Sequence, residues 1–471
     1  MASLGQIVDL FTVNHLSKEA IMIRVPKGLE PLVNELKNDF TKEPTAERVV
    51  WLMMAAVLVV GNRTVSALVR LMALIDRVNP STYHRVFSHR RWNTTRLARI
   101  IIRFILKRYV LKGPTRICGD ETVDGHRGKN VYGKARHRDA VRSSHSHTVF
   151  RYGHKWIVLA ILIHFPYCSR PLALPILVAL YRDKKTNTKD GRRHKTPVEL
   201  MCGLLTLLMR WFPDRKWEFA GDGGYGTHEF ARFAYRHRER LTLVSKFMKD
   251  ANLYHQPPKR KIGDKGRPRK KGKPMAKPET VVARSSKKRL TVQWYGGGTR
   301  RVEVVSGTGN WFKSGFGLVP VLWVYVHDLT GTHRDEYFFT TNLSMTAKQV
   351  IELYAARWNI ETTFQELRSH LGLETTRGWS RMTVLRMAPC LIVLYTLVVL
   401  FYDQLQRTRK SRRLRVRWVG KNQITFSDMI ADVRSYLWLE WVFAQAPGGE
   451  GVRKLSRPIQ RLIEYGLTQA A

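Results

Sequence analysis

The chain has 471 residues, enough for a sizeable core and about two to four domains. Lys and Arg number 81 against 37 Asp and Glu, so the formal net charge is +44. Few folded proteins carry such a charge without a polyanion partner, which makes nucleic acid the leading candidate. The alternative on charge alone is a ribosomal-type or otherwise merely basic protein.

The cysteines argue against two further classes of protein. Cys118, Cys168, Cys202 and Cys390 are scattered and form no Cys-x2-Cys pair, so neither a zinc knuckle nor a disulfide framework is predicted. This usage fits a reducing cytoplasm. The N-terminal segment lacks a basic stretch followed by a long apolar one, so no signal peptide is expected.

Residues 1–112 are predicted to form a helical DNA-binding domain. Apolar helices are expected at 46–60 and 65–77, with a stop at Gly61 and a cap at Thr64 between them. A further capped helical stretch rich in Arg and His follows. The arrangement resembles a helix-turn-helix, and the alternative is a plain helical bundle.

Residues 113–247 change to a pattern of strands and helices. Two short strands, 115–119 and 217–221, each end at an aspartate, Asp120 and Asp222. The pattern also predicts strands at 155–165, 172–181 and 241–247, and helices at 197–211 and 228–240. Near-continuous apolar strands are typical of burial on both faces, so an α/β core is expected.

Residues 248–340 begin with a basic loop and continue as alternating segments separated by glycine turns, which predict antiparallel strands. Helices resume over 341–405, and a basic helical tail is expected at 406–471. Residues 387–402 carry no charge, but sixteen residues fall short of the roughly 20 that a membrane span needs. We therefore expect a buried helix packed on a sheet, and no membrane partner.

The segment from Tyr354 to Arg368 places four polar side chains in one helical register. Tyr354, Arg357, Glu361 and Arg368 stand at offsets 0, 3, 7 and 14, which align on one stripe at about 3.6 residues per turn. Such a stripe is a poor core face. It suits a phosphate backbone held by the cations and a divalent metal held by the glutamate.

Asp120, Asp222 and Glu361 are the candidate catalytic and metal-binding residues. Phosphodiester chemistry with two Mg²⁺ or Mn²⁺ ions needs carboxylates from separate elements that meet at one point. Two carboxylates at strand ends and one on a covering helix satisfy this need. Taken singly, each residue has an ordinary alternative, as a turn or cap aspartate or as a solvated helix glutamate.

Residues 354–368 match the signature Tyr-x2-Arg-x3-Glu-x6-Lys, with Arg368 in the place of the lysine. The chain thereby resembles the DDE transposases of bacterial insertion sequences, in the insertion-sequence-four-like superfamily. Asp120 stands in an Asp-x-Thr motif, and Asp222 in a Gly-Asp-Gly-x-Tyr-like context. The resemblance covers about residues 115–405. It implies an α/β fold with an RNase H-like core that a β-rich insertion domain interrupts between the second and third acids.

The resemblance also implies domain boundaries and partners. Residues 113–247 and 341–405 would form the two parts of the core, and 248–340 the basic loop and insertion domain. Double-stranded DNA, both transposon ends and target, is the implied partner, bound by a homodimer. The bacterial cytoplasm, in association with the nucleoid, is the implied location.

Roles for single residues follow from the same resemblance. Tyr354 and Arg357 would hold phosphates near the cleaved transposon end, while Arg368 keeps the lysine's charge but offers a planar fork. In some relatives a tryptophan of the insertion domain flips a base as a DNA hairpin forms. The candidates here, each with core packing as its alternative, are Trp294, Trp311 and Trp323.

Two basic segments, 259–273 and 407–417, are predicted to bind backbone phosphate without reading bases, or else to be solvated charged loops. Their candidate DNA-binding residues are Lys259, Arg260, Lys261, Arg267, Arg269, Lys270, Lys271, Arg407, Arg409, Lys410, Arg412 and Arg413. Five histidines crowd another stretch, namely His126, His137, His145, His147 and His154. Without Cys or acids at ligand spacing, DNA or core contacts are favoured for them over a metal site.

The sequence thus predicts a metal-dependent transposase that binds inverted repeats at transposon ends, cleaves there and joins the freed 3′ end to target DNA. Two alternatives stay open. One is an RNase H-like nuclease that cuts without joining. The other is a non-catalytic DNA-binding protein derived from a transposase.

Overall fold

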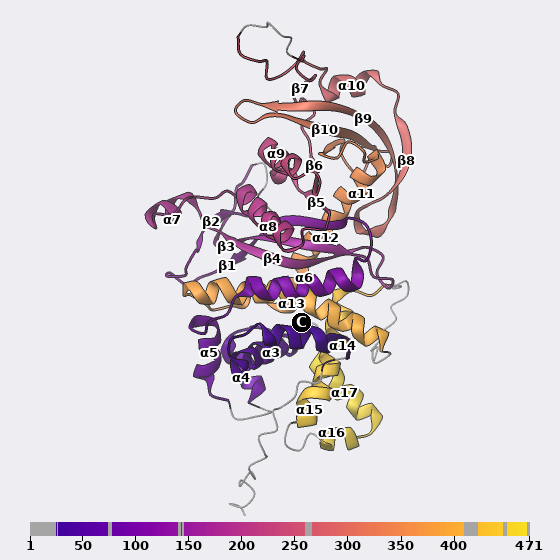
Figure 1. Ribbon diagram of the computed structural model, residues 1–471. Helices are drawn as coiled ribbons and strands as arrows, with labels where there is room; N and C mark the ends of the chain where they lie inside the picture. The colour runs from indigo at the N-terminus through magenta and orange to yellow at the C-terminus, as the bar shows by residue number, and fades with distance from the viewer. Residues whose placement is uncertain are drawn as a thin grey trace, which may run out of the picture.

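The computed structural model of the protein describes residues 25, 27–73, 78–139, 143, 146–259, 266–408, 423–445 and 450–468. Within them the fold is mixed α/β, with one large twisted sheet between helices (Figure 1). Several helices lie beneath the sheet in Figure 1, and a strongly curved group of strands lies above.

The described strands form one 11-stranded sheet in the order β2-β3-β1-β5-β6-β11-β10-β9-β7, with β4 paired to β3 and β8 to β9. Their bounds are β1 Thr115–Gly125, β2 Ala135–Arg138, β3 Phe150–Ile163, β4 Leu172–Tyr181, β5 Trp217–Gly221, β6 Leu241–Lys246, β7 Leu253–Tyr254, β8 Lys288–Gln293, β9 Thr299–Lys313, β10 Gly317–Asp328 and β11 Glu336–Thr340. The β1–β5 and β5–β6 pairs are parallel, and the other pairs are antiparallel.

The helices alternate with these strands along the chain. Those before the sheet are η2 Lys27–Leu29, α2 Glu30–Asn38, α3 Glu43–Leu58, α4 Val65–Met72, α5 Pro80–Ser88 and α6 Thr94–Tyr109. Those between strands are α7 Lys184–Lys189, α8 Pro197–Trp211, η3 Gly223–Tyr225, α9 His228–Arg236, α10 Pro278–Arg284 and η4 Tyr295–Gly297. Those after the last strand are α11 Ala347–Arg357, α12 Asn359–Leu371, η5 Leu373–Thr375, α13 Arg381–Arg407, α14 Phe426–Leu437, η6 Trp438–Val442, α15 Phe443–Gln445, α16 Glu450–Lys454 and α17 Arg457–Thr468.

Local chemistry accounts for many of these boundaries. Thr196 and Thr346 each close a capping box at the start of α8 and α11, where the threonine side chain and a residue three positions on satisfy each other's free backbone N–H groups. The central stretch of β3, residues 156–161, is fully buried, as its unbroken apolar sequence predicted.

Three local expectations were wrong. The strand expected to end at Asp120 continues to Gly125, because its antiparallel ladder with β3 extends to that residue. The single helix expected from residue 347 is two helices, α11 and α12, that meet at Trp358. The helix expected at 228–240 ends at Arg236, where His237 leaves helical geometry.

The strands of residues 248–340 continue the main sheet. β11 pairs with β6, and β10 pairs with β11 and β9, so the curved upper strands of Figure 1 are hydrogen-bonded to the central ones. The sequence pattern predicted their antiparallel pairing but gave no information on which core strand they would join.

Helix α13 lies between the sheet and a second helical layer. It packs on β4 on one side and on α3, α5 and α14 on the other, as Figure 1 also displays. By length and composition it could cross a membrane, yet 78% of its most apolar 18-residue window is buried inside the fold. The expectation of a buried helix against a sheet is thus confirmed.

Arg386 of α13 fastens this helix to the end of α5. Its guanidinium donates hydrogen bonds to the backbone oxygens of Val86, Phe87 and Trp92 at 3.2, 3.0 and 3.1 Å. The Val86 and Phe87 carbonyls belong to the C-terminal end of α5, where helical oxygens lack partners within the helix, and Trp92 lies in the connection to α6.

We expect Arg386→Met to lower the free energy of unfolding by about 2–4 kcal/mol, because the buried Phe87 carbonyl would lose its Arg386 donor, as would the Val86 and Trp92 carbonyls. Urea unfolding followed by circular dichroism measures this. The exposed Arg381 at the start of the same helix gives the control variant Arg381→Met, which should change stability by less than about 0.5 kcal/mol. Equal effects of the two substitutions would contradict this role for Arg386.

Candidate active site

Two of the three predicted acids come directly after the parallel ladder of β1 and β5. This ladder ends at the pair Gly119 and Gly221. Asp120 is the next residue of β1, and Asp222 directly follows the last residue of β5. Since adjacent strands are about 4.8 Å apart, the two backbones deliver their carboxylates to the same place.

Glu361 comes to this place from above the sheet. It lies in the first turn of α12, and α11 and α12 both pack on β1. The side chain of Asp120 is 15% exposed and that of Glu361 is 35% exposed, so the site is open to solvent on the helix side.

Arg357 joins the carboxylates. Its Nη1 lies 2.9 Å from Oδ2 of Asp120, and its Nη2 lies 3.0 Å from Oε1 of Glu361. Asp222 interacts electrostatically with all three of these groups. The structure therefore brings Asp120, Asp222, Glu361 and Arg357 into one cluster of three anions and one cation.

The pKa of Asp120 is raised to about 7, chiefly because burial disfavours its charged form. Arg357 opposes this rise, whereas Asp222 and Glu361 add to it. The pKa of Glu361 is also raised, first by burial, against the lowering effect of Arg357. Carboxylates that resist ionising together are the groups that gain most from a bound cation.

Asp222 is held by its own turn. Its Oδ1 accepts a hydrogen bond from the Gly224 N–H at 3.0 Å, and its backbone oxygen accepts one from the Ser245 hydroxyl at 2.6 Å. A Cβ on Gly226 would lie 2.4 Å from the Lys246 backbone oxygen, so a glycine is needed there for the turn to close against β6.

The donor set fits a hard divalent cation. The three candidate ligand residues are all acids, and carboxylate oxygens are the ligands that Mg²⁺ and Mn²⁺ prefer. The Arg357 guanidinium now supplies the positive charge between two of the carboxylates.

The other two residues of the predicted stripe have different surroundings. Tyr354 is buried, with its ring 4.3 Å from that of Phe338, so a phosphate contact by its hydroxyl stays a prediction. Arg368 donates from Nη2 to the Thr122 hydroxyl and from Nε to Glu374 at 3.1 Å. Arg368 thus connects the helix to the Asp-x-Thr motif of β1.

The three candidate tryptophans are all packed inside the fold. Trp294, Trp311 and Trp323 are 9%, 5% and 2% exposed. A role in base flipping stays a prediction for each of them. Trp358, to which the sequence interpretation gave no role, is 44% exposed and directly follows Arg357, with its ring 5.9 Å from that of Tyr295. The position of Trp358 between Arg357 and Glu361 of the signature segment could have marked it as a candidate site residue.

The basic segments are described only in part. Lys259, Arg267, Arg269 and Lys270 are exposed, and Lys271 donates to the Tyr254 hydroxyl at 2.9 Å. Arg407 pairs with Asp403 at 2.6 Å. The remaining candidates, Arg260, Lys261, Arg409, Lys410, Arg412 and Arg413, lie outside the described residues, as does His145.

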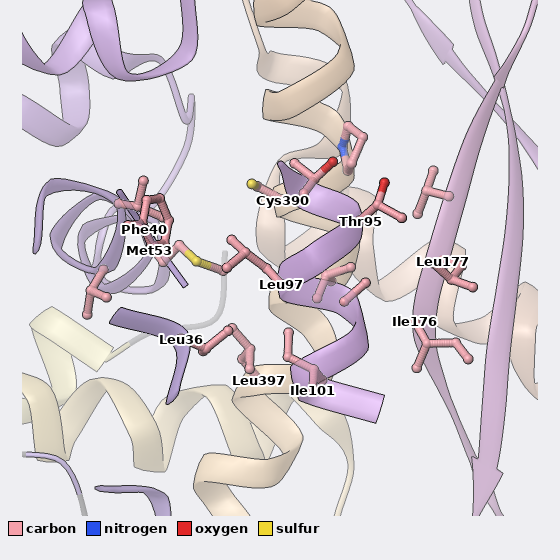
Figure 2. Close-up of a pocket in the computed structure, with 17 residues that line it drawn as sticks. Leu36, Phe40, Met53, Thr95, Leu97, Ile101, Ile176, Leu177, Cys390 and Leu397 are labelled. Atoms are coloured by element: carbon pink, nitrogen blue, oxygen red, sulfur yellow. The ribbon is translucent and has the colours of Figure 1, made fainter. Parts of the chain in front are cut away.

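A pocket elsewhere in the fold is apolar. It lies between α6, α13 and β4, and its lining includes Leu97, Ile176 and Leu397 (Figure 2). No charged side chain lines it among the described residues, so it does not offer ligands for the chemistry of the acidic site.

Carboxylates grouped at the ends of parallel strands in a mixed α/β fold define a candidate metal-dependent site, and comparison with known families agrees. The model of the DDE superfamily endonuclease family matches residues 35–301, which include Asp120 and Asp222. The chain belongs to this family. The model of the archaeal putative transposase ISC1217 family matches residues 276–414, which include Glu361.

Comparison with individual proteins adds little detail. A piggyBac transposase, solved by cryo-electron microscopy as a synaptic complex with hairpin DNA, is similar over 91% of this chain and 76% of its own. The two share 11% identity, with a TM-score of 0.41. No curated protein sequence matches the chain significantly.

We expect the affinity for Mn²⁺ to depend on pH through Asp120. Below a pKa of about 7 this carboxyl is protonated, so the metal must displace a proton. Affinity should fall about tenfold per pH unit below 7 and level off above it. Isothermal titration calorimetry from about pH 5.5 to 8.5 measures this dependence of the Mn²⁺ affinity on pH.

Arg357→Gln is the matched variant for this experiment. Loss of the guanidinium removes the main group that lowers the pKa of Asp120. The pH below which the Mn²⁺ affinity falls should therefore be higher in this variant. Two results would contradict a role for Asp120 in metal binding. One is an Mn²⁺ affinity of the unmodified protein that does not change with pH, and the other is an unchanged pH dependence in the Arg357→Gln variant.

Proposed function

We propose that the protein is a DNA transposase that cleaves transposon ends and joins them to target DNA through Asp120, Asp222 and Glu361. The observation that carries the proposal is the convergence of these three acids on Arg357 in a chain of the DDE superfamily endonuclease family. The match of the C-terminal part to a putative transposase family favours transposition over other reactions of such sites.

The fold we propose for the core is RNase H-like. The strand order β4-β3-β1-β5-β6 supports this interpretation. In it the β4–β3 and β3–β1 pairs are antiparallel, and the β1–β5 and β5–β6 pairs are parallel. Strands β7 to β10 stand between the second and third acids in the sequence, where the insertion domain was expected.

Asp120, Asp222 and Glu361 would hold two Mg²⁺ or Mn²⁺ ions. Such ions activate water or a 3′-OH and stabilise the leaving oxygen. The protein's part is to place the acids and to hold Asp120 ionised. The Arg357 guanidinium, whose planar fork is suited to a phosphate, would contribute positive charge beside the acids.

DNA is the proposed polyanion partner, both as transposon end and as target. The net charge of +44 supports this, as do the exposed basic residues at 267–270. Assembly as a homodimer on DNA and a cytoplasmic, nucleoid-associated location belong to the same proposal and follow from the resemblance to bacterial transposases.

The decisive experiment is a cleavage and joining assay with the DNA that flanks the gene and with Mg²⁺. Asp120→Ala, Asp222→Ala and Glu361→Ala should each reduce cleavage by about 10⁴-fold or more, because the three acids act as a unit. Asp214→Ala, at an exposed aspartate just before β5, is the control and should cleave normally. DNA binding by each variant is measured in parallel by mobility shift.

The other outcomes distinguish the alternatives. Cutting without joined products would favour the nuclease. Binding without any cutting would favour the non-catalytic DNA-binding protein. Equal cutting by the triad variants and the unmodified protein would show that the chemistry lies elsewhere.

Trp358 is a further proposed DNA contact at this site. It is exposed beside Arg357, and an aromatic face next to the reacting phosphate can stack on a terminal or unpaired base. Trp358→Ala should weaken binding to end DNA by about 1–3 kcal/mol. Trp379→Ala, at a more exposed tryptophan outside residues 354–368, should bind normally in fluorescence anisotropy. Equal losses in both variants would contradict a specific contact.

A further inference from the structure

A second cluster of ligand-type side chains lies further along β1. Asp120 and Asp124 are on the same face of the strand, four residues and therefore about 13 Å apart. Asp124 is paired across the sheet with His154 of β3, and His126 follows the end of β1. Asp124, His126 and His154 each offer one ligand atom within 4.8 Å of the others.

The cluster is buried, and the two ring nitrogens that face Asp124, His126 Nε2 and His154 Nδ1, have no hydrogen-bond partner. The side chains of Asp124, His126 and His154 are 0%, 7% and 1% exposed. His126 Nε2 lies 3.5 Å from Asp124 Oδ2, and His154 Nδ1 lies 3.4 Å from Asp124 Oδ1. These separations exceed the usual 2.7–3.2 Å of a hydrogen bond, and neither nitrogen has a hydrogen-bond partner.

If His154 is neutral, its tautomer makes this arrangement unfavourable without a cation. Its Nε2 lies 2.9 Å from the backbone oxygen of Tyr132, which can only accept, so Nε2 carries the hydrogen. In the neutral ring Nδ1 is then a lone pair that faces a carboxylate oxygen of Asp124. Two acceptors in a buried place repel each other unless positive charge lies between them.

The surroundings also fix the ligands in place. The His154 backbone N–H donates to Asp124 Oδ1 at 3.0 Å, and Trp156 Nε1–H donates to Oδ2 at 3.1 Å. A histidine that donates its second ring N–H to a carbonyl, beside an oriented carboxylate, is the outer arrangement typical of metal-binding histidines. A small cleft lined by the two histidines and by Thr383 and Met387 of α13 adjoins the cluster.

The ligand atoms lie close enough together to share one ion. His126 Nε2 lies 3.5 Å from Asp124 Oδ2, His154 Nδ1 lies 3.4 Å from Asp124 Oδ1, and one ligand atom from each of the three residues lies within 4.8 Å of the others. Imidazole nitrogen selects zinc-type ions over Mg²⁺, so this donor set differs in kind from the all-carboxylate site.

We propose that Asp124, His126 and His154 bind one zinc-type ion, separate from the metal ions of the acidic site. The ion holds the ends of β1 and β3 together beneath the start of α13. It thereby steadies the strand that carries Asp120. The proposal does not depend on the transposase function, because its ligands and its test are independent of DNA chemistry.

The test is zinc binding by the full chain after removal of metals with a chelator. Excess Mg²⁺ is present to occupy the acidic site, and Zn²⁺ is titrated against a chromophoric competitor. We expect one zinc ion per chain and a higher Tm with zinc than without it. His126→Ala should weaken binding by about 100-fold or more.

Two controls make the result specific. His137→Ala removes another buried histidine, from β2, whose Nε2 also lacks a hydrogen-bond partner, and this variant should bind zinc normally. The double variant Asp120→Asn, Glu361→Gln should also bind normally, because it alters only the acidic site. His154→Gln is a second ligand variant, and its folding is checked by circular dichroism.

Three results would overturn the proposal. They are no zinc uptake by the unmodified chain, equal uptake by His126→Ala, and loss of zinc in the Asp120→Asn, Glu361→Gln variant. The first would mean that His154 is an imidazolium paired with Asp124, and the third that zinc binds at the acidic site.

Discussion

The ion pairs of Arg357 are the interaction on which the acidic site depends. Three carboxylates in a partly buried place repel one another and lose hydration, so the cluster needs a cation to stay folded in this form. The guanidinium supplies it through 2.9 and 3.0 Å contacts to Asp120 and Glu361. The same contacts hold α11 and α12 over the ends of β1 and β5, because Arg357 is the last residue of α11 and Glu361 lies in the first turn of α12.

Strand β1 carries residues of both candidate sites in the core. Its parallel pairing with β5 ends beside Asp120 and Asp222, while its antiparallel pairing with β3 continues to Gly125. Alternate residues on one face of β1 therefore have different roles. Asp120 belongs to the acidic site, Thr122 contacts Arg368, and Asp124 belongs to the histidine cluster. A strand that had ended at Asp120, as the sequence pattern suggested, would not have carried the second cluster.

The histidines illustrate why the sequence interpretation missed that cluster. His126 and His154 are far apart in the chain, and the acid that completes the set, Asp124, lies on the strand that also carries Asp120. Ligand spacing along a sequence detects sites built on one loop or helix. This set is instead assembled across two antiparallel strands, by the register that places Asp124 opposite His154.

The sequence by itself indicated the broad DDE class, the motifs around the three acids, most element types and the burial of α13. These depend on local periodicity, capping and spacing, which neighbouring residues fix. Only the tertiary structure decided that Arg357 stands between Asp120 and Glu361, that Tyr354 is buried, that Trp358 is exposed, and that β11 joins the curved strands to β6. Each of these outcomes depends on contacts between segments about a hundred residues or more apart, or on which face of an element is covered, and no local pattern encodes them.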